Sequence, residues 1–124
     1  MSDIPFDQLR SQQVLIIPPG QVRFIRVRTV RFERQMEGEM ESGDVIRKSG
    51  LIFDLEAVFP DDGSVMYRLW NRRSIGMWQP LIQTGEYRGR WVKIFRTGEG
   101  PTSDHVPTLM APDFVPQIQD LAPG

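Results

Sequence analysis

The sequence predicts a single mainly β domain, folded as a small barrel of about five strands with one short helix or connector. Two observations predict this fold class. Runs rich in Val, Ile, Phe and Thr are separated by Gly, Pro and Asp turn signals. A chain of 124 residues with 40% hydrophobic content can also bury one core. We place the barrel at residues 1–106 and an extended, proline-rich tail at 107–124.

The first predicted strand is the long run 21–34, QVRFIRVRTVRFER. Its apolar residues fall on one parity, then on the other, and then on the first again: Val22 and Phe24, Ile25 and Val27, Val30 and Phe32. A strand that changes phase twice contains bulges or a sharp bend. Small closed barrels use such strands in both halves of the sheet, so this run favours a barrel.

A hairpin is predicted at residues 51–70. Its arms, 51–59 and 64–70, alternate inward and outward side chains around the turn PDDG, in which proline opens the turn and Asp-Gly closes it. The inward side chains are Leu51, Phe53, Leu55, Ala57 and Phe59 on the first arm, and Val65, Tyr67 and Leu69 on the second. Met66, Arg68 and Trp70 then face outward.

Two segments interrupt the strand pattern. Residues 35–50 are polar, acidic and punctuated by glycine, which indicates an exposed loop or the extension of a hairpin. Residues 71–86 lose the strand period and indicate a short helix or packed connector, broken at Pro80, with Trp78 in the core.

The run RGRWVKIFR, 88–96, is the final predicted strand, followed by a loop in which Gly98 or Gly100 takes a positive φ. Among small barrels, an OB-like fold fits this order of elements best. A sandwich or an SH3-like barrel would give much the same sequence.

Composition argues against several classes of protein. No apolar run is long enough to span a bilayer and no signal-peptide pattern begins the chain, so we expect a cytoplasmic protein, in the host cytoplasm if it is viral. Cysteine is absent, and His105 is the only histidine, in a loop without a patterned acidic partner. We therefore expect no enzyme, no metal site and no cofactor.

The basic residues are unusual in kind and in distribution. Net charge is −1, but thirteen of the fifteen basic residues are arginine, whose planar guanidinium suits phosphates and aromatic faces. Basic residues gather at 23–34, 68–73 and 88–96, and acidic residues at 37–44 and 54–62. This segregation predicts either one positive face on a nearly neutral molecule or pairing of arginines with carboxylates across strands.

Aromatic and basic residues alternate on two of the predicted strands. In RWVKIFR, alternation places Val92 and Ile94 inward and the residues between them outward. Outward aromatic rings stack on bases while cations follow the phosphates, as binding of a single strand needs. The opposite orientation would bury Trp91 and Phe95 in the core. The predicted nucleic-acid-binding residues are Arg68, Trp70, Arg72, Arg73, Arg88, Arg90, Trp91, Lys93, Phe95 and Arg96.

The segment GRWVKIFRTGEGPTSDH, 89–105, resembles the closing segment of small phage-type single-stranded-DNA-binding proteins with an OB-like fold. The matching residues are Gly89, Lys93, Ile94, Arg96, Gly98, Gly100 and Thr102. Where that family has an aromatic residue and then a further strand, this sequence has His105 and a proline-rich tail. The resemblance implies an OB-like barrel that binds single-stranded DNA during DNA replication.

We interpret the chain as a module that binds single-stranded nucleic acid without sequence preference, with DNA favoured over RNA. The alternative is a protein-interaction or assembly module, such as a phage structural or adaptor protein, in which arginines contact acidic loops of a neighbouring subunit. A homo-oligomer is compatible with both interpretations. The C-terminal segment DFVPQIQDLAPG either docks on a protein partner or folds onto its own barrel. No membrane contact is expected.

Overall fold

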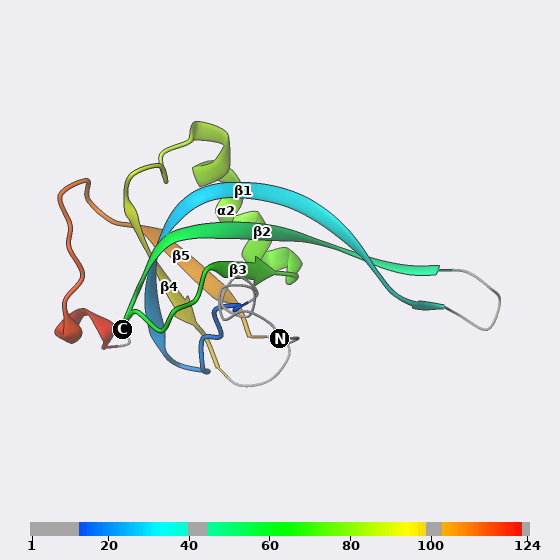
Figure 1. The fold of residues 1–124 in the computed structure, drawn as a ribbon, viewed down its shortest axis with the longest axis horizontal. Coiled ribbons are helices and arrows are strands. Elements are labelled where there is room, and N and C mark those ends of the chain that lie inside the picture. The colour runs from blue at the N-terminus through cyan, green and yellow to red at the C-terminus, as the bar shows by residue number, and fades with distance from the viewer. Residues whose placement is uncertain (1–12, 40–44, 99–102, 123–124) are drawn as a thin grey trace, which may run out of the picture.

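The computed structural model describes residues 13–39, 45–98 and 103–122, which form one antiparallel sheet of five strands with one α-helix (Figure 1). The strand order across the sheet is β3-β2-β1-β4-β5. The mainly β prediction is therefore confirmed. The elements are β1 (Val22–Glu39), β2 (Val45–Phe59), β3 (Met66–Leu69), α2 (Arg72–Thr84), β4 (Trp91–Arg96), β5 (His105–Leu109) and the 3-10 helix η1 (Ile118–Leu121).

Strand β1 lies at the centre of the sheet because it pairs with two partners. Residues Val22–Arg26 pair with β4, and the strand from Phe24 onward pairs with β2. The register with β2 shifts on both sides of the Val27–Leu55 pair, and again after Met36. These shifts confirm the predicted bulges. They let one strand bend from the β4 side of the sheet to the β2 side.

The second phase change in β1 follows from a bulge. Val27 lies opposite Leu55 and Thr29 lies opposite Asp54, so Arg28 is an extra residue without a partner on β2. Val30 therefore points toward the core, as Val27 does. A single inserted residue turns the strand's inward positions from odd to even numbers.

The first phase change has a different cause. Phe24 belongs to the opposite face of β1 from the core, yet it is only 1% exposed. The C-terminal segment covers it, because the Phe114 ring lies 5.3 Å from the Phe24 ring, centroid to centroid. Phe59 contacts the same ring edge-on at 6.4 Å. Of the two alternatives for the C-terminal segment, the structure therefore has the one that folds back onto its own sheet.

The sheet curves strongly (Figure 1), but among the described residues no backbone ladder joins β3 to β5. The structure therefore corrects the predicted closed barrel to an open, curved sheet. The chain before β1 lies beside the free edge of β3, where the Leu15 N–H donates to the Met66 carbonyl at 2.8 Å. Leu15 and Ile17 are both buried in the core.

Side chains, rather than a ladder, connect the two edge strands. The Tyr67 hydroxyl on β3 lies 2.7 Å from His105 Nδ1 on β5. The His105 N–H donates to Ser74 Oγ of α2 at 2.8 Å. Because Tyr67 and Ser74 are almost fully buried, these two bonds join β3, β5 and α2 at one place inside the opening of the sheet.

The core lies between the concave face of the sheet and α2. Trp78 on α2 is fully buried, as predicted, with its ring 4.6 Å from that of Phe53. Val92 and Ile94 are also fully buried, so β4 has the predicted orientation. The described residues include no helix with the length and apolar content needed to cross a membrane.

Pro80 does not break the helix, contrary to the prediction. It lies inside α2, which continues to Thr84. A proline removes one intrahelical donor, but Trp78 before it and Leu81 after it both pack on the core. We attribute the intact helix to this packing on both sides of the proline.

The run 88–96 is not the last strand, also contrary to the prediction. Residues His105–Leu109 form β5, so the first residues assigned to the tail belong to the sheet. Pro107 lies opposite Ile94 in the ladder with β4. An edge strand tolerates a proline, since the missing N–H can face away from the ladder.

On β2, the alternation holds only to Leu55. Val58 is buried in the core, whereas Ala57 and Phe59 are half-buried. The alternation changes at Glu56, which is an extra residue between the Val27–Leu55 and Arg26–Ala57 pairs. This insertion shifts the inward-facing positions of β2 by one residue.

The segment 35–50 is mostly strand, which confirms the second of its two alternatives. Strand β1 runs to Glu39 and β2 begins at Val45, so the two form a long hairpin that projects from the body (Figure 1). Residues 40–44 lie outside the described ranges.

The bond between Tyr67 and His105 predicts a dependence of stability on pH. Burial, and secondarily the Arg96 charge, lower the pKa of His105, while Asp104 opposes the shift. The folded state therefore favours the neutral imidazole. Its contribution to the free energy of unfolding is present above the unfolded pKa, about 6.5, and is lost as pH falls through the folded value. We expect urea midpoints of the wild type to fall more steeply between pH 7 and 5 than those of His105→Gln. Parallel pH profiles would contradict this role for His105.

Candidate nucleic-acid interface

The two predicted outward faces lie on strands that are not neighbours. Strands β2 and β1 separate β3 from β4 in the sheet. The outward residues of β3 and those of β4 therefore belong to two surfaces. The sequence groups these residues in one predicted binding set, whereas the strand order places them on two separate surfaces, each with its own contacts.

The first surface is the outer face of β1, β2 and β3. Arg68 on β3 is exposed, as predicted, while Tyr67 and Leu69 on either side of it are buried. Ile52 on β2 lies opposite Arg68, and Arg31 on β1 lies opposite Ile52. An apolar residue is thus placed between two arginines on this face.

Trp70 follows β3 and lies over Gly50 of β2. A Cβ added at Gly50 would lie 2.3 Å from Trp70 Cε3 and 2.6 Å from the Leu69 carbonyl oxygen. No side chain fits there, so glycine is what permits the ring to approach the strand so closely. Trp70 is half-buried in this position. The aromatic ring therefore has a fixed place on the outer face, two residues beyond Arg68.

Helix α2 begins directly after Trp70 and adds two exposed arginines. Asn71 caps the helix, with its Oδ1 accepting from the N–H groups of Arg73 and Ser74 at 2.8 and 3.2 Å. Arg73 forms an ion pair with Asp104 at 3.3 Å. Arg72 forms none with any described residue. Within the described ranges, the arginines next to Trp70 that form no ion pair are thus Arg68 and Arg72.

The second surface is the outward face of β4. Trp91, Lys93 and Phe95 are each half-buried, so neither aromatic residue lies in the core, as the opposite orientation would require. Lys93 lies opposite Phe24 of β1, and Phe24 is the residue that Phe114 covers. The C-terminal segment therefore occupies part of this surface.

Two of the predicted cations next to β4 hold segments of the chain together. Arg90 donates from Nε and Nη2 to the Met110 carbonyl, at 2.8 and 2.6 Å. Arg96 donates to the Ile17 carbonyl at 2.8 Å and to Ser103 Oγ at 2.9 Å. Arg88 remains exposed, with its guanidinium 5.8 Å from the centre of the Tyr87 ring.

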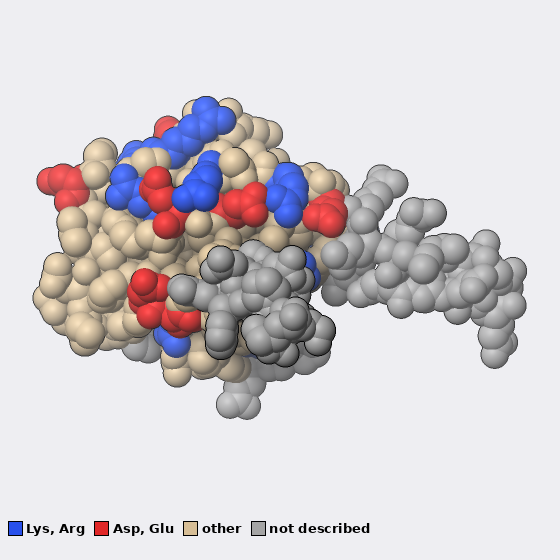
Figure 2. Space-filling model, in the orientation of Figure 1, with Lys and Arg blue, Asp and Glu red and all other residues tan. Residues whose placement is uncertain are grey.

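Charge alternates along the outer face of the β1–β2 hairpin (Figure 2). Arg31 contacts both Asp54, at 2.7 Å, and Glu33, at 3.6 Å. Arg26 Nε lies 2.9 Å from Glu56 Oε2, a charge contact without hydrogen-bond alignment. Pairing of arginines with carboxylates across strands is thus confirmed for this hairpin. Arg26 and Arg31 are therefore partly neutralised by these carboxylates.

Two residues of the first surface were not among the predicted binding residues. Arg31 is one of several arginines in a long strand, and no local pattern distinguishes it from the others. Gly50 ends the polar run 35–50, for which the sequence indicates an exposed loop or the extension of a hairpin. A glycine that opens an apolar strand is a signal for close approach by another group, and it could have identified the position.

The structure describes only the two ends of the loop after β4, since residues 99–102 lie outside the described ranges. Gly98 takes a positive φ of 37°, as predicted, and the alternative Gly100 lies outside the described ranges. The described part of the chain contains no group of three His, Cys, Asp or Glu side chains able to hold a metal ion.

Comparison with known proteins found no similarity. No family model, curated protein or solved structure matched the chain. The resemblance to phage-type single-stranded-DNA-binding proteins therefore stays a prediction, and function has to be inferred from geometry.

The contact between Trp70 and Gly50 predicts a specific effect of substitution. Gly50→Ala should displace the indole ring and lower the free energy of unfolding by about 1–3 kcal/mol, as overpacking does. The tryptophan emission spectrum should change with it. Gly76→Ala is the matched control, because nothing lies within 4 Å of a Cβ at that helical position, and it should stabilise the fold by up to about 1 kcal/mol. A Gly50→Ala protein as stable as the wild type would contradict the close packing of Trp70.

Proposed function

We propose that this protein binds single-stranded nucleic acid on the outer face of β2 and β3, and that DNA is the ligand to test first. The placement of Trp70 over Gly50, beside Arg68 and Arg72, which form no ion pair with any described residue, carries the proposal. An aromatic ring flanked by cations suits a single strand of any sequence, since bases stack on the ring and cations follow the phosphates.

The connectivity of the strands supports an OB-like assignment. Strand β1 pairs with both β2 and β4, the order is β3-β2-β1-β4-β5, and α2 connects β3 to β4. OB folds are five-stranded, partly open Greek-key barrels that bind oligonucleotides on the face of strands 2 and 3. The aromatic and basic residues described above lie on the corresponding face of this sheet.

Each residue of the surface has a separate role in the proposal. Trp70 stacks on a base, which contributes about 1–3 kcal/mol. Arg68, Arg72 and Arg31 contact phosphates, although Arg31 divides its charge between the ligand and Asp54. About three phosphate contacts on a single strand give a slope of about −2 for the logarithm of the binding constant against that of salt concentration.

The β4 surface has a smaller role than the sequence predicted. Trp91, Lys93 and Phe95 lie beside the part of β1 that the C-terminal segment covers. Arg90 and Arg96 are bound to backbone carbonyls. A strand of nucleic acid that follows β3 meets none of these residues, because β2 and β1 lie between.

A protein-interaction or assembly role is the second candidate, and one observation favours it. Val115 and Ile118 on the C-terminal segment are 65% and 75% exposed, although Pro116 between them is buried. Two exposed apolar side chains on a segment anchored to the sheet suit contact with another protein. Such hydrophobic contact should survive added salt, whereas binding of nucleic acid should not.

Charge substitutions test the proposed surface against the β4 surface. Arg68→Gln and Arg72→Gln should each weaken binding of a mixed-sequence single strand of about 15 nucleotides by about three- to tenfold. Each should also reduce the salt slope by about 0.7, the share of one phosphate contact. Fluorescence anisotropy at several salt concentrations measures both quantities.

Lys93→Gln is the matched control, and it should change affinity less than about twofold because it removes a cation from the other surface. A loss in Lys93→Gln equal to that in Arg68→Gln would move the interface to β4. Absence of binding by the folded wild type at about 50 mM salt, where phosphate contacts are strong, would reject the proposed function.

A further inference from the structure

Two bulges lie back to back on β1 and β2. Arg28 is the extra residue on β1, after the Val27–Leu55 pair, and Glu56 is the extra residue on β2, before it. Bulges bend a strand and redirect the side chain of the inserted residue, and they often occur beside binding sites. Here both inserted residues line the same pocket.

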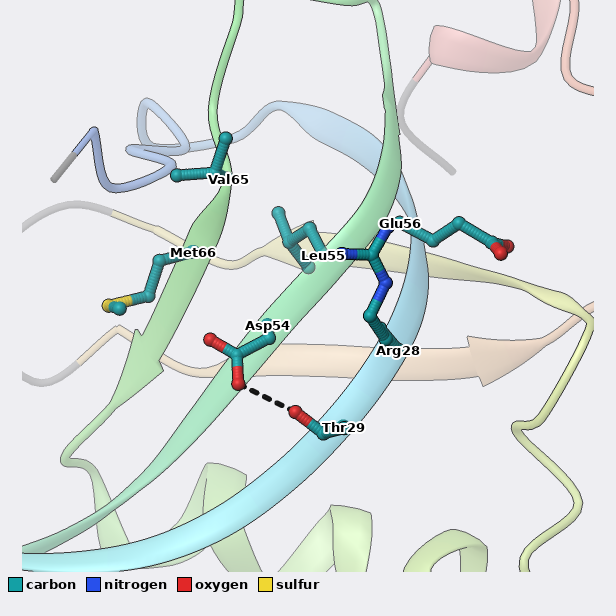
Figure 3. A pocket seen from close by; sticks show the side chains of 7 residues that line it. All are labelled: Arg28, Thr29, Asp54, Leu55, Glu56, Val65 and Met66. Carbon is teal, nitrogen blue, oxygen red and sulfur yellow. Dashed lines mark hydrogen bonds between the residues drawn. The ribbon is translucent and has the colours of Figure 1, made fainter. Parts of the chain in front are cut away.

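The pocket opens on the outer face of the hairpin and has a volume of about 550 Å³ (Figure 3). It therefore lies on the same face of the sheet as Arg68 and Trp70. Met66 is four residues from Trp70, roughly 14 Å at about 3.4 Å per strand residue. The lining residues are Arg28, Thr29, Asp54, Leu55, Glu56, Val65 and Met66.

One of the arginines at the pocket has no carboxylate partner among the described residues. Asp54 contacts Arg31 at 2.7 Å, Arg31 also contacts Glu33 at 3.6 Å, and Glu56 contacts Arg26 at 2.9 Å. Arg28 is the third arginine of this group, and it forms no ion pair with any described residue. Its guanidinium therefore has no carboxylate to occupy it within the described part of the chain. An arginine guanidinium in this state is suited to a phosphate.

Asp54 keeps one oxygen available for a ligand. Its Oδ2 accepts from the Thr29 hydroxyl at 2.6 Å and from Arg31 at 2.7 Å. Oδ1 accepts no hydrogen bond from any described residue, and it turns away from Thr29 toward the side of Met66 (Figure 3). The Thr29 and Arg31 bonds fix the carboxylate, so Oδ1 is a positioned acceptor next to the apolar side chains of Val65 and Met66.

We propose that this pocket holds one base that carries an exocyclic amino group, together with its phosphate. This inference rests on the proposed function and names the ligand at one end of that surface. The base lies against Val65 and Met66, its amino group donates to Asp54 Oδ1, and Arg28 contacts the phosphate. Cytosine, adenine and guanine have such an amino group. Thymine and uracil have a carbonyl oxygen in place of the cytosine amino group, which an ionised carboxylate repels, and their N3–H is flanked by two such oxygens.

The pocket therefore adds a base preference to a surface that otherwise tolerates any sequence. A site whose polar group must pair with a ligand donor discriminates against analogues that lack the donor. For one hydrogen bond at a partly open site, we expect oligo(dC) to bind about five- to tenfold more tightly than oligo(dT) of equal length.

Anisotropy titrations of labelled oligo(dC) and oligo(dT), each of about 15 nucleotides, test the inference. Asp54→Asn should reduce the preference for oligo(dC) to less than about twofold, because the carboxylate acceptor is lost. Arg68→Gln is the control variant, and it should weaken both oligonucleotides equally and leave their ratio unchanged. Urea midpoints of all variants establish that each is folded.

A measurement on the wild type keeps the inference testable if Asp54→Asn does not fold. The methyl NMR signal of Met66, assigned with Met66→Leu, should shift on addition of dCMP and shift less with dTMP. Equal affinities for oligo(dC) and oligo(dT), or an unchanged preference in Asp54→Asn, would overturn the pocket and leave the proposed function standing. Absence of binding to both oligonucleotides would instead overturn the proposed function.

Discussion

The central position of β1 is the constraint on which the rest of the structure depends. One strand has to pair with β4 at its start and with β2 along most of its length, and a flat strand cannot serve two curved halves of a sheet. The bulges at Arg28 and Glu56 supply the bend. The same two insertions set which residues of β2 face the core, and they produce the pocket on the outer face. The bend of the sheet and the pocket are thus consequences of the same pair of bulges.

The two edge strands, β3 and β5, are connected by side chains and not by a backbone ladder among the described residues. Tyr67, His105 and Ser74 join β3, β5 and α2 through two hydrogen bonds, and the chain before β1 adds two apolar residues to the core. This arrangement needs no ladder between the edge strands. It also explains why arginines near β4 serve the fold, since Arg90 and Arg96 tie flanking segments to the sheet through backbone carbonyls. The sequence alone does not tell which arginines stabilise the fold and which can contact a ligand. That distinction requires the hydrogen-bond acceptor of each one to be known.

Local patterns predicted the strand content, the bulges in β1, the orientation of β4 and the burial of Trp78, because each depends on the alternation of neighbouring residues. They did not predict which strands are neighbours. Strand order depends on packing across the whole chain, and it separates two outward faces that look alike in the sequence. The sequence did not predict β5 because Pro107 lies within it, and a proline usually argues against a strand. Gly50 was missed because its role depends on Trp70, twenty residues away in the sequence and adjacent in space.

The contact between Phe24 and Phe114 joins residues ninety positions apart. During synthesis on the ribosome, the central strand emerges early, while the segment that shields its outer side emerges only after β5. Phe24 therefore stays uncovered until nearly the whole domain has been translated. Long-range contacts of this kind slow folding, and a nascent β-strand with an uncovered aromatic residue is prone to self-association. The order in which the chain is made thus exposes one aromatic side chain of the central strand to self-association until the C-terminal segment has emerged.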